Sequence, residues 1–120
     1  MQNFLLILSN VVLVVIGQVL IKQGVNKIGG FDWSHLVNFL FRSFTAPLII
    51  LGLVFYVISA AIWIIILSKM PLSFAYPMIS IGYVLILFIS WLFLHETIAP
   101  LRILGVLLIC LGIFFIFKTA

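Results

Sequence analysis

The sequence predicts an all-α integral membrane protein with four transmembrane helices and a short interfacial helix between the first and the second. Apolar residues make up 67% of the chain, charged residues make up 7%, and the mean hydropathy is +1.51. A soluble domain of 120 residues could not bury that much apolar surface. Four apolar segments each approach the ~20 residues that a helix needs to cross ~30 Å of hydrocarbon. These segments lack the alternating pattern of barrel strands, so a single helical domain over residues 1–120 is predicted.

The first predicted span covers residues 3–21 and contains no acidic residue. Gln18 and Lys22 are expected to carry its polar chemistry, because residues four apart lie on one helix face. Gln18 could hydrogen-bond to a neighbouring helix while Lys22 extends to the interface. Alternatively, both could line a cavity in which Lys22 compensates an anionic group such as phosphate. The sequence leaves both interpretations open.

The segment after the first span predicts an interfacial helix over residues 34–45, preceded by a turn at Gly29 and Gly30. Apolar side chains recur there at the spacing of one helix face, and polar ones occupy the other face. Either Asp32 or Ser34 is expected to cap this helix. Such a helix lies in the lipid headgroup layer with its apolar face toward the hydrocarbon. The apolar face consists of Trp33, Leu36, Val37, Leu40, Phe41 and Phe44.

The second predicted span, residues 47–67, carries a stripe of small, polar and aromatic residues, and Lys69 follows it. An aromatic stripe on a membrane helix serves packing more often than binding. Both uses stay open for this stripe, in which Tyr56 and Trp63 are the candidate binding residues. The stripe consists of Gly52, Tyr56, Ser59 and Trp63.

The third predicted span, residues 72–94, carries hydroxyl-bearing residues at steps of three and four, which predicts one polar helix face. Pro77 removes a backbone donor and is expected to kink the helix, which exposes carbonyl groups near Ser73. The kink could also serve packing alone. The polar face consists of Ser73, Tyr76, Ser80 and Tyr83.

Charged residues flank the start of the fourth predicted span, residues 100–117. Glu96 is the only glutamate of the chain, and it is expected to pair with Arg102 or His95 as a structural clamp. A charge pair at the mouth of a cavity could also meet a substrate. Further along the span, two glycines seven residues apart predict a close helix–helix seam, between subunits. The seam consists of Gly105, Leu108, Ile109 and Gly112.

The distribution of basic residues bears on membrane orientation. Four of the six lysines and arginines fall on one side of the predicted spans and two on the other, a weak bias once the α-amino group is added. Dual insertion, and with it an antiparallel homodimer, is therefore a hypothesis. Because the basic residues are dispersed, no nucleic-acid partner is expected. The chain has no phosphate-binding loop, metal-ligand cluster or paired carboxylates, so we expect neither an enzyme nor a cofactor or metal.

Four motifs spread over nearly the whole length resemble a known family. They are Gly17 through Lys22, Pro71 through Pro77, His95-Glu96, and Gly105 through Gly112. The chain resembles a small four-helix member of the drug/metabolite transporter superfamily, in the EamA-like and small-multidrug-resistance-like group. Within that group it is most similar to subunits that flip aminoarabinose-phosphoundecaprenol. Small multidrug exporters carry a glutamate in the first helix where this chain has Val14, which disfavours drug–proton antiport.

The resemblance implies a flippase for polyprenyl-phosphate-linked sugars in the bacterial inner membrane, surrounded by membrane lipids. It implies a dimer, either an antiparallel homodimer or a heterodimer with a sister subunit. An exporter of small metabolites or cationic compounds and a non-transporting scaffold subunit are the alternatives. The residues expected to contact the substrate are Gln18, Lys22, Tyr56, Trp63, Lys69, Ser73, Tyr76, Ser80, Glu96 and Arg102.

Overall fold

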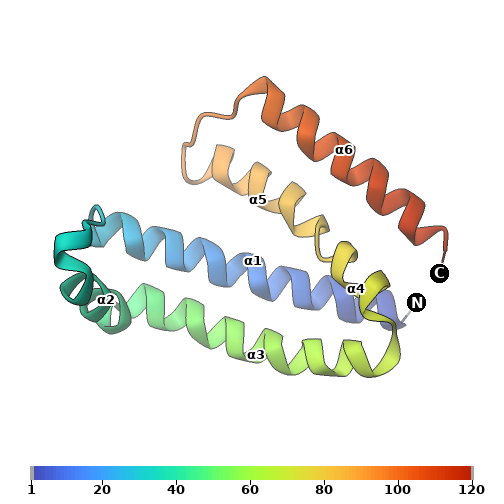
Figure 1. Ribbon diagram of the computed structural model, residues 1–120, viewed down its shortest axis with the longest axis horizontal. Helices are drawn as coiled ribbons and strands as arrows, with labels where there is room; N and C mark the ends of the chain where they lie inside the picture. The colour runs from blue at the N-terminus through green and yellow to red at the C-terminus, as the bar shows by residue number, and fades with distance from the viewer. Residues whose placement is uncertain (1, 120) are drawn as a thin grey trace.

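A computed structural model describes residues 2–119, and within them four helical segments are long and apolar enough to cross a membrane (Figure 1). The predicted fold class is therefore confirmed. Helix α1 begins and helix α6 ends at the same end of the bundle, as an even number of crossings requires. The helices are α1 (Gln2–Ile28), α2 (Leu36–Thr45), α3 (Pro47–Lys69), α4 (Leu72–Met78), α5 (Ile81–Leu92) and α6 (Pro100–Phe117), with a 3₁₀ turn η1 (Trp33–His35) before α2.

Helices α1 and α3 form a close antiparallel pair along most of their length (Figure 1). The pair is close because glycines face each other: a Cβ built on Gly52 would lie 2.6 Å from the carbonyl oxygen of Gly17. Nearby, the buried Asn10 donates from Nδ2 to the carbonyl oxygen of Ser59 at 2.7 Å. A polar side chain in the hydrocarbon layer needs such a partner, and here it joins the two helices.

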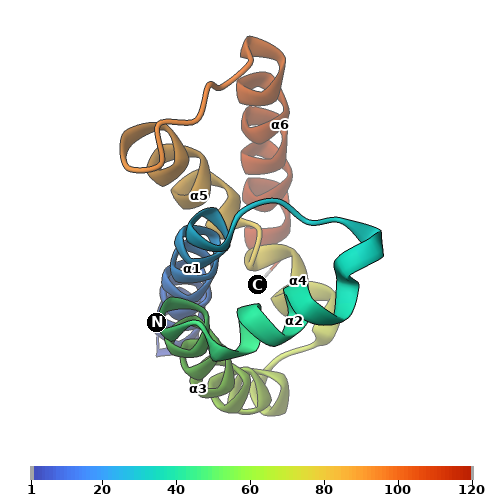
Figure 2. The ribbon, with the colours of Figure 1, turned by 90° about the vertical axis from the view of Figure 1, so that its left-hand side faces the viewer.

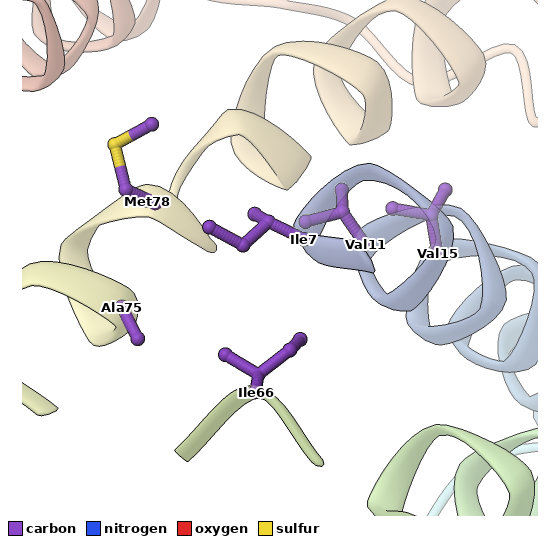
Figure 3. Packing of buried hydrophobic residues seen from close by; sticks show 6 residues of the cluster. All are labelled: Ile7, Val11, Val15, Ile66, Ala75 and Met78. Atoms are coloured by element: carbon purple, nitrogen blue, oxygen red, sulfur yellow. The ribbon is translucent and has the colours of Figure 1, made fainter. Parts of the chain in front are cut away.

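The apolar core lies where α1, α3 and α4 meet (Figure 3). Three of its side chains come from successive turns of α1, because residues four apart share a helix face. Val11 and Val15 face α5, where a Cβ built on Gly82 would lie 3.5 Å from each of them. This core holds α4 against the α1–α3 pair through Ala75 and Met78. Its members are Ile7, Val11, Val15, Ile66, Ala75 and Met78.

Helix α1 continues well beyond the predicted span of residues 3–21 and ends at Ile28. Gly29 follows with a φ of +104°, a left-handed conformation that glycine adopts without strain. Lys22 therefore lies inside the helix rather than just after it. The lysine therefore stays on the helix face of Gln18, four residues before it, and lines one pocket with Glu96 of the α5–α6 connection.

A helix is present where the interfacial helix is predicted, and it lies across the end of the bundle opposite both termini (Figures 1 and 2). Its apolar side chains are not covered by the rest of the chain: Val37 is 81% exposed and Phe41 is 69% exposed. An uncovered apolar face suits the boundary of a lipid layer. The location of α2 in the headgroup layer stays a prediction.

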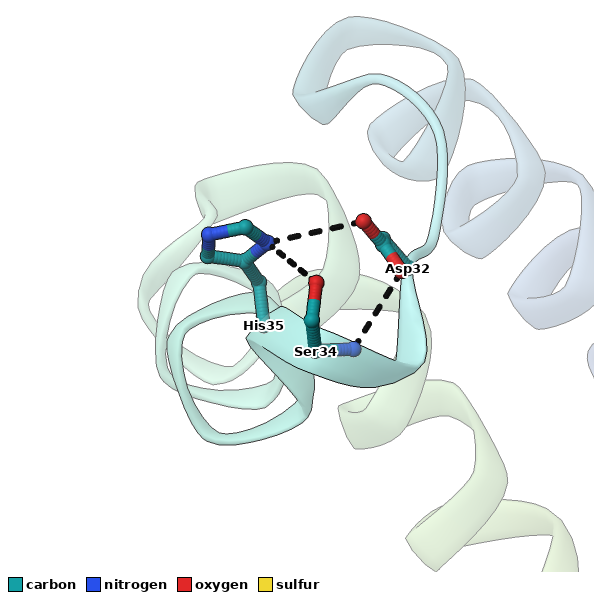
Figure 4. Close-up of polar contacts among 3 residues, drawn as sticks. All are labelled: Asp32, Ser34 and His35. Carbon is teal, nitrogen blue, oxygen red and sulfur yellow. Dashed lines mark hydrogen bonds and ion pairs between the residues drawn. The ribbon is translucent and has the colours of Figure 1, made fainter.

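Polar contacts position η1 and α2 (Figure 4). Of the two capping candidates, Asp32 caps the turn η1, since its Oδ1 accepts from the backbone N–H of Ser34 at 3.2 Å. Helix α2 itself begins after His35 without a side-chain cap, so neither candidate caps it directly. Hydrogen bonds from the Ser34 hydroxyl and N–H, with a smaller contribution from His35, hold the pKa of Asp32 below its usual value. The cap is therefore at full strength above that value and weakens as the pH falls through the folded pKa. Arg42 donates from Nη2 to the carbonyl oxygen of Ile28 at 3.1 Å, which ties α2 to the end of α1.

The third membrane crossing is interrupted, and the break at Ile79 and Ser80 separates α4 from α5. It follows two residues after Pro77, which leaves the Ser73 carbonyl without its usual helical donor. The N–H groups of Ile79 and Ser80 donate to the carbonyls of Tyr76 and Pro77, three residues back, so the backbone tightens before α5 begins.

Helix α6 is the outermost helix; it packs beside α4 and α5 and lies away from α3 (Figures 1 and 2). At its end, the rings of Phe117 and Phe4 meet edge to face, 5.9 Å apart. No residue of its apolar window is buried, and a Cβ built on Gly105 or Gly112 would have no neighbour within 4 Å. The seam predicted at these glycines is therefore not formed within the described residues. A seam with a second subunit stays a prediction.

Candidate functional site

An open groove runs between α1 and the broken third crossing. Its inner part has a volume of about 280 Å³. Gln18 contributes the amide, and Tyr76, Ser80 and Tyr83 contribute hydroxyl groups from the other wall. The helix of the third crossing is interrupted at Ile79 and Ser80, and because both residues line the inner part, it lies directly beside this break. The complete lining is Val11, Val14, Val15, Gln18, Tyr76, Ile79, Ser80, Gly82, Tyr83 and Ile86.

The outer part of the groove, about 320 Å³, continues along α1 and α5 toward the α5–α6 connection. Gln18 and Ile86 line both parts, so the two adjoin. We call them together the α1–α5 groove. Lys22 and Glu96 are the charged residues in its lining. The complete lining of the outer part is Gln18, Val19, Lys22, Ile86, Ser90, Leu94 and Glu96.

Lys22 and Glu96 face each other across the outer part, with 4.0 Å between Nζ and Oε1. The partner expected for Glu96 was Arg102 or His95, and among residues 2–119 the structure gives Lys22 instead. The physical reason is that α1 stays helical past residue 21, so Lys22 remains on the helix face of Gln18 and lines the groove opposite Glu96. Both side chains remain partly exposed, at 50% and 40%.

The backbone of Glu96 is fixed even though its side chain is not. Its N–H donates to the carbonyl oxygen of Ser90 at 3.0 Å, across the end of α5. The preceding residue, His95, has a φ of 56°, in the left-handed region that residues other than glycine rarely adopt. This turn reverses the chain at the end of α5 and brings Glu96 back over the groove.

Substitutions at His95 test this turn. We expect His95→Gly to keep or raise stability, because glycine adopts a left-handed φ without strain. We expect His95→Val to lose about 1–2 kcal/mol, because a branched Cβ clashes with the backbone in this region. Thermal unfolding of the two variants in detergent would measure the difference, and equal midpoints would contradict the strained geometry.

The structure separates the remaining residues expected at the site. Ser73 lies outside the α1–α5 groove because it is one turn before Tyr76, at the start of α4, where residues of α1 and α6 lie around it. It lines a second pocket with Asn3 and Phe117, so the four hydroxyl-bearing residues do not share one face. The other expected residues that do not line either part of the groove are Tyr56, Trp63, Lys69 and Arg102.

The stripe on α3 serves packing at several of its positions. Gly52 faces α1, and the hydroxyl group of Ser59 donates to the Tyr56 carbonyl at 2.8 Å. The Trp63 ring meets the Tyr76 ring edge to face at 6.3 Å, so Trp63 packs behind a groove residue. Lys69 ends α3 at the far end of the bundle from Lys22, and Arg102 lies in the first turn of α6.

Sequence reasoning overlooked two polar residues. Ser90 lines the outer part of the groove, and its spacing of seven from Tyr83 continues the polar face of the third crossing by two turns. That periodicity could have identified it. Asn10 was passed over as well, and it is a packing residue whose amide joins α1 to α3. Tyr83, predicted on the polar face without a binding role, lines the inner part.

A larger apolar hollow of about 860 Å³ adjoins the groove between α5 and the start of α6. Glu96 lines this hollow as well as the groove, so the carboxylate stands at their boundary. The hollow is lined by Val84, Leu87, Phe88, Trp91, His95, Glu96, Thr97, Ile98 and Ile103.

Named proteins resemble this chain over nearly its whole length. A relative from Shewanella sediminis, described as a probable 4-amino-4-deoxy-L-arabinose-phosphoundecaprenol flippase subunit ArnF, is 33% identical over 96% of this chain and 87% of its own. An ArnF relative from Photorhabdus laumondii is 32% identical over 97% of both chains. A relative from Aeromonas hydrophila, described as subunit ArnE of the same flippase, is 35% identical over 92% of this chain and 93% of its own.

No protein-family model matches the chain, and no solved structure matches it. The family is shown by the relatives, whose similarity extends over all four membrane crossings and the connections between them. This confirms the resemblance drawn from the motifs. The chain therefore belongs to the family of 4-amino-4-deoxy-L-arabinose-phosphoundecaprenol flippase subunits that includes ArnE and ArnF.

Proposed function

We propose that this chain is a subunit of a flippase that moves aminoarabinose-phosphoundecaprenol, or a closely similar polyprenyl-phosphate-linked sugar, across the bacterial inner membrane. The observation that carries the proposal is the α1–α5 groove, whose two adjoining parts are lined by residues from Ser80 at the break to the cation Lys22. The names of the relatives point to the same substrate. Translocation breaks no covalent bond, so the groove needs only to bind and release the lipid.

The chemistry of the groove suits a phosphate-linked sugar. Lys22 supplies a positive charge for the phosphate, and Gln18 and Tyr76 supply hydrogen-bond donors for the sugar. Both parts of the groove are open rather than enclosed, so the polar headgroup of a lipid can lie in the groove while its polyprenyl tail remains in the bilayer.

An exporter of cationic compounds would need a carboxylate in the middle of this groove. The inner part presents Val14 at that level, and no acidic residue lines it. The one carboxylate in the lining, Glu96, stands at the outer end beside Lys22. The inner part of the groove therefore offers a cationic drug no carboxylate with which to pair.

A second subunit is part of the proposal. Helix α6 presents an apolar surface with open space at Gly105 and Gly112, which suits close contact with another membrane helix. The relatives carry two subunit names, which supports a sister chain as the partner, with an antiparallel homodimer as the other arrangement. The mass of the complex extracted gently from membranes, measured by native mass spectrometry, distinguishes the two.

The proposed function is tested in vesicles that contain the purified complex and aminoarabinose-phosphoundecaprenol in both leaflets. An amine reagent that cannot cross the membrane labels only lipid in the outer leaflet. We expect vesicles with the complex to allow nearly complete labelling, because lipid from the inner leaflet reaches the outside. Empty vesicles are the control, and labelling that stops at the outer-leaflet fraction in both samples would refute the proposal.

A further inference from the structure

The Lys22–Glu96 pair has features that a purely structural ion pair does not need. Among residues 2–119 it is the one ion pair between a lysine or arginine and a carboxylate. It joins α1 to the α5–α6 connection, and both partners line the α1–α5 groove. The pair therefore lies at the place where, under the proposed function, a headgroup enters or leaves.

The geometry of the pair is loose. The 4.0 Å between Nζ and Oε1 is longer than the ~2.7–2.9 Å of a charge-assisted hydrogen bond. Both side chains are partly exposed, so each charge keeps contact with solvent or a guest. The Glu96 backbone, in contrast, is held by its bond to the Ser90 carbonyl and by the His95 turn. The carboxylate is thus anchored at the groove while its partner can be exchanged at small cost.

The outer part of the groove presents one positive charge, on Lys22, and one negative charge, on Glu96. The other residues of the outer part are apolar or, like Gln18 and Ser90, uncharged hydrogen-bonding groups. A guest with only a negative charge would be attracted by Lys22 and repelled by Glu96. A guest that carries a phosphate and a protonated amine on different carbons of its sugar would satisfy both residues at once.

We propose that Glu96 is the residue that selects lipids with an amino sugar. When the headgroup binds, the Lys22–Glu96 pair separates: Lys22 pairs with the phosphate, and Glu96 pairs with the ammonium group of the sugar. This inference rests on the proposed function. Glu96 also borders the apolar hollow between α5 and α6, where the first part of the lipid chain has apolar space beside the headgroup. Lys22 and Glu96 each have a partner of opposite charge before and after binding, so neither charge is left unpaired in the membrane.

The test compares two lipids in vesicles that contain the complete complex. One is aminoarabinose-phosphoundecaprenol, and the other is the same lipid with its amine acetylated, which keeps the phosphate and the chain but removes the positive charge. Reversible binding, measured by native mass spectrometry, and translocation, followed with a radiolabelled lipid, give a preference ratio for each variant. Wild type is expected to prefer the amine-bearing lipid by at least about tenfold, because a charged hydrogen bond is lost with the acetylated one.

Glu96→Gln is expected to lower translocation of the amine-bearing lipid about tenfold and to leave the acetylated lipid unchanged or faster, so that the ratio approaches one. Glu96→Asp should retain part of the preference, since it keeps the charge. Asp32→Asn is the matched control: it removes the same charge from the chain's other acidic side chain, which lies before α2 and outside the groove, and it should keep the wild-type ratio.

The outcomes separate this inference from the proposed function. Equal loss with both lipids in Glu96→Gln, or a wild-type complex without preference, overturns the selection by Glu96 while the flippase function stands. A wild-type complex that translocates neither lipid overturns the proposed function itself. If Glu96→Gln does not fold, the preference ratio of Glu96→Asp tests the inference instead. If Glu96→Asp keeps the full wild-type preference and the wild-type translocation rate, a role that depends on the reach of the carboxylate is contradicted.

Discussion

Lys22→Ala is expected to reduce translocation of the phosphate-linked lipid by about ten- to a hundredfold, the equivalent of losing one charged hydrogen bond of ~1.5–3 kcal/mol. Among residues 2–119, Lys22 is the only cation in the lining of the α1–α5 groove, so no other side chain there can take its place at the phosphate. The fold should persist, because the Lys22 side chain is half exposed and Glu96, freed of its partner, keeps its access to solvent.

The amine-labelling assay measures this loss, and Lys27→Ala is its matched control. Lys27 lies on the same helix and at the same end of the bundle, and it has the same charge, but it does not line the groove. We expect its translocation rate to remain near that of wild type. Equal effects of the two substitutions would mean that the lysines act through overall charge or topology, and the assignment of Lys22 to the phosphate would be wrong.

Gly52→Ala is expected to destabilise the protein by about 1–3 kcal/mol, the usual cost of overpacking. A Cβ at this position would lie 2.6 Å from the Gly17 carbonyl oxygen and 2.7 Å from Cγ1 of Ile21. The carbonyl belongs to the backbone of α1, so the two helices must move apart to make room. Separation would also lengthen the bond between Asn10 and the Ser59 carbonyl, which the α1–α3 pair holds at 2.7 Å.

Unfolding in detergent with increasing denaturant measures this change, with Gly82→Ala as the control. Gly82 is also a buried helical glycine, but a Cβ there would lie 3.5 Å from methyl groups of Val11 and Val15, an ordinary contact. Alanine favours a helix over glycine by about 1 kcal/mol, so the control should be neutral or slightly stabilising. A Gly52→Ala variant as stable as the control would show that the α1–α3 seam is looser than the structure describes.

The membrane crossings could be predicted because they depend on local properties. Hydropathy over about twenty residues identifies a span without knowledge of its neighbours, and the four predicted spans correspond to the observed segments. The helix that follows Trp33 was predicted from its amphipathic spacing in the same way. The four motifs, of which Gly17 through Lys22 is the first, also led to the correct family, which the relatives confirm.

The site was predicted less completely, because its members come from separate helices. Gln18, Tyr76 and Ser80 do line one groove, whereas Ser73 belongs to another pocket. The predicted partner of Glu96 was wrong. Nearness in the sequence favours Arg102, only six residues away, whereas the observed partner, Lys22, comes from α1.

The glycines show the same limit. Gly105 and Gly112 have the spacing of a packing seam, yet the close approach within the chain occurs at Gly17 and Gly52. Spacing describes one helix face, and it does not tell which other helix, if any, covers that face. A partner for the α6 glycines has to be sought outside this chain.

Hydropathy, helix periodicity and the motifs thus establish a four-helix membrane protein of this flippase family, since each is a property of consecutive residues. The meeting of Lys22 with Glu96, and the alignment of both with the hydroxyl groups of α4 and α5, follow from other causes. They depend on the continuation of α1 past residue 21, the break at Ile79 and Ser80, and the turn at His95. Small changes in any of these would rotate or shift a helix face by several ångströms, which is why such contacts emerge only when the helices are packed.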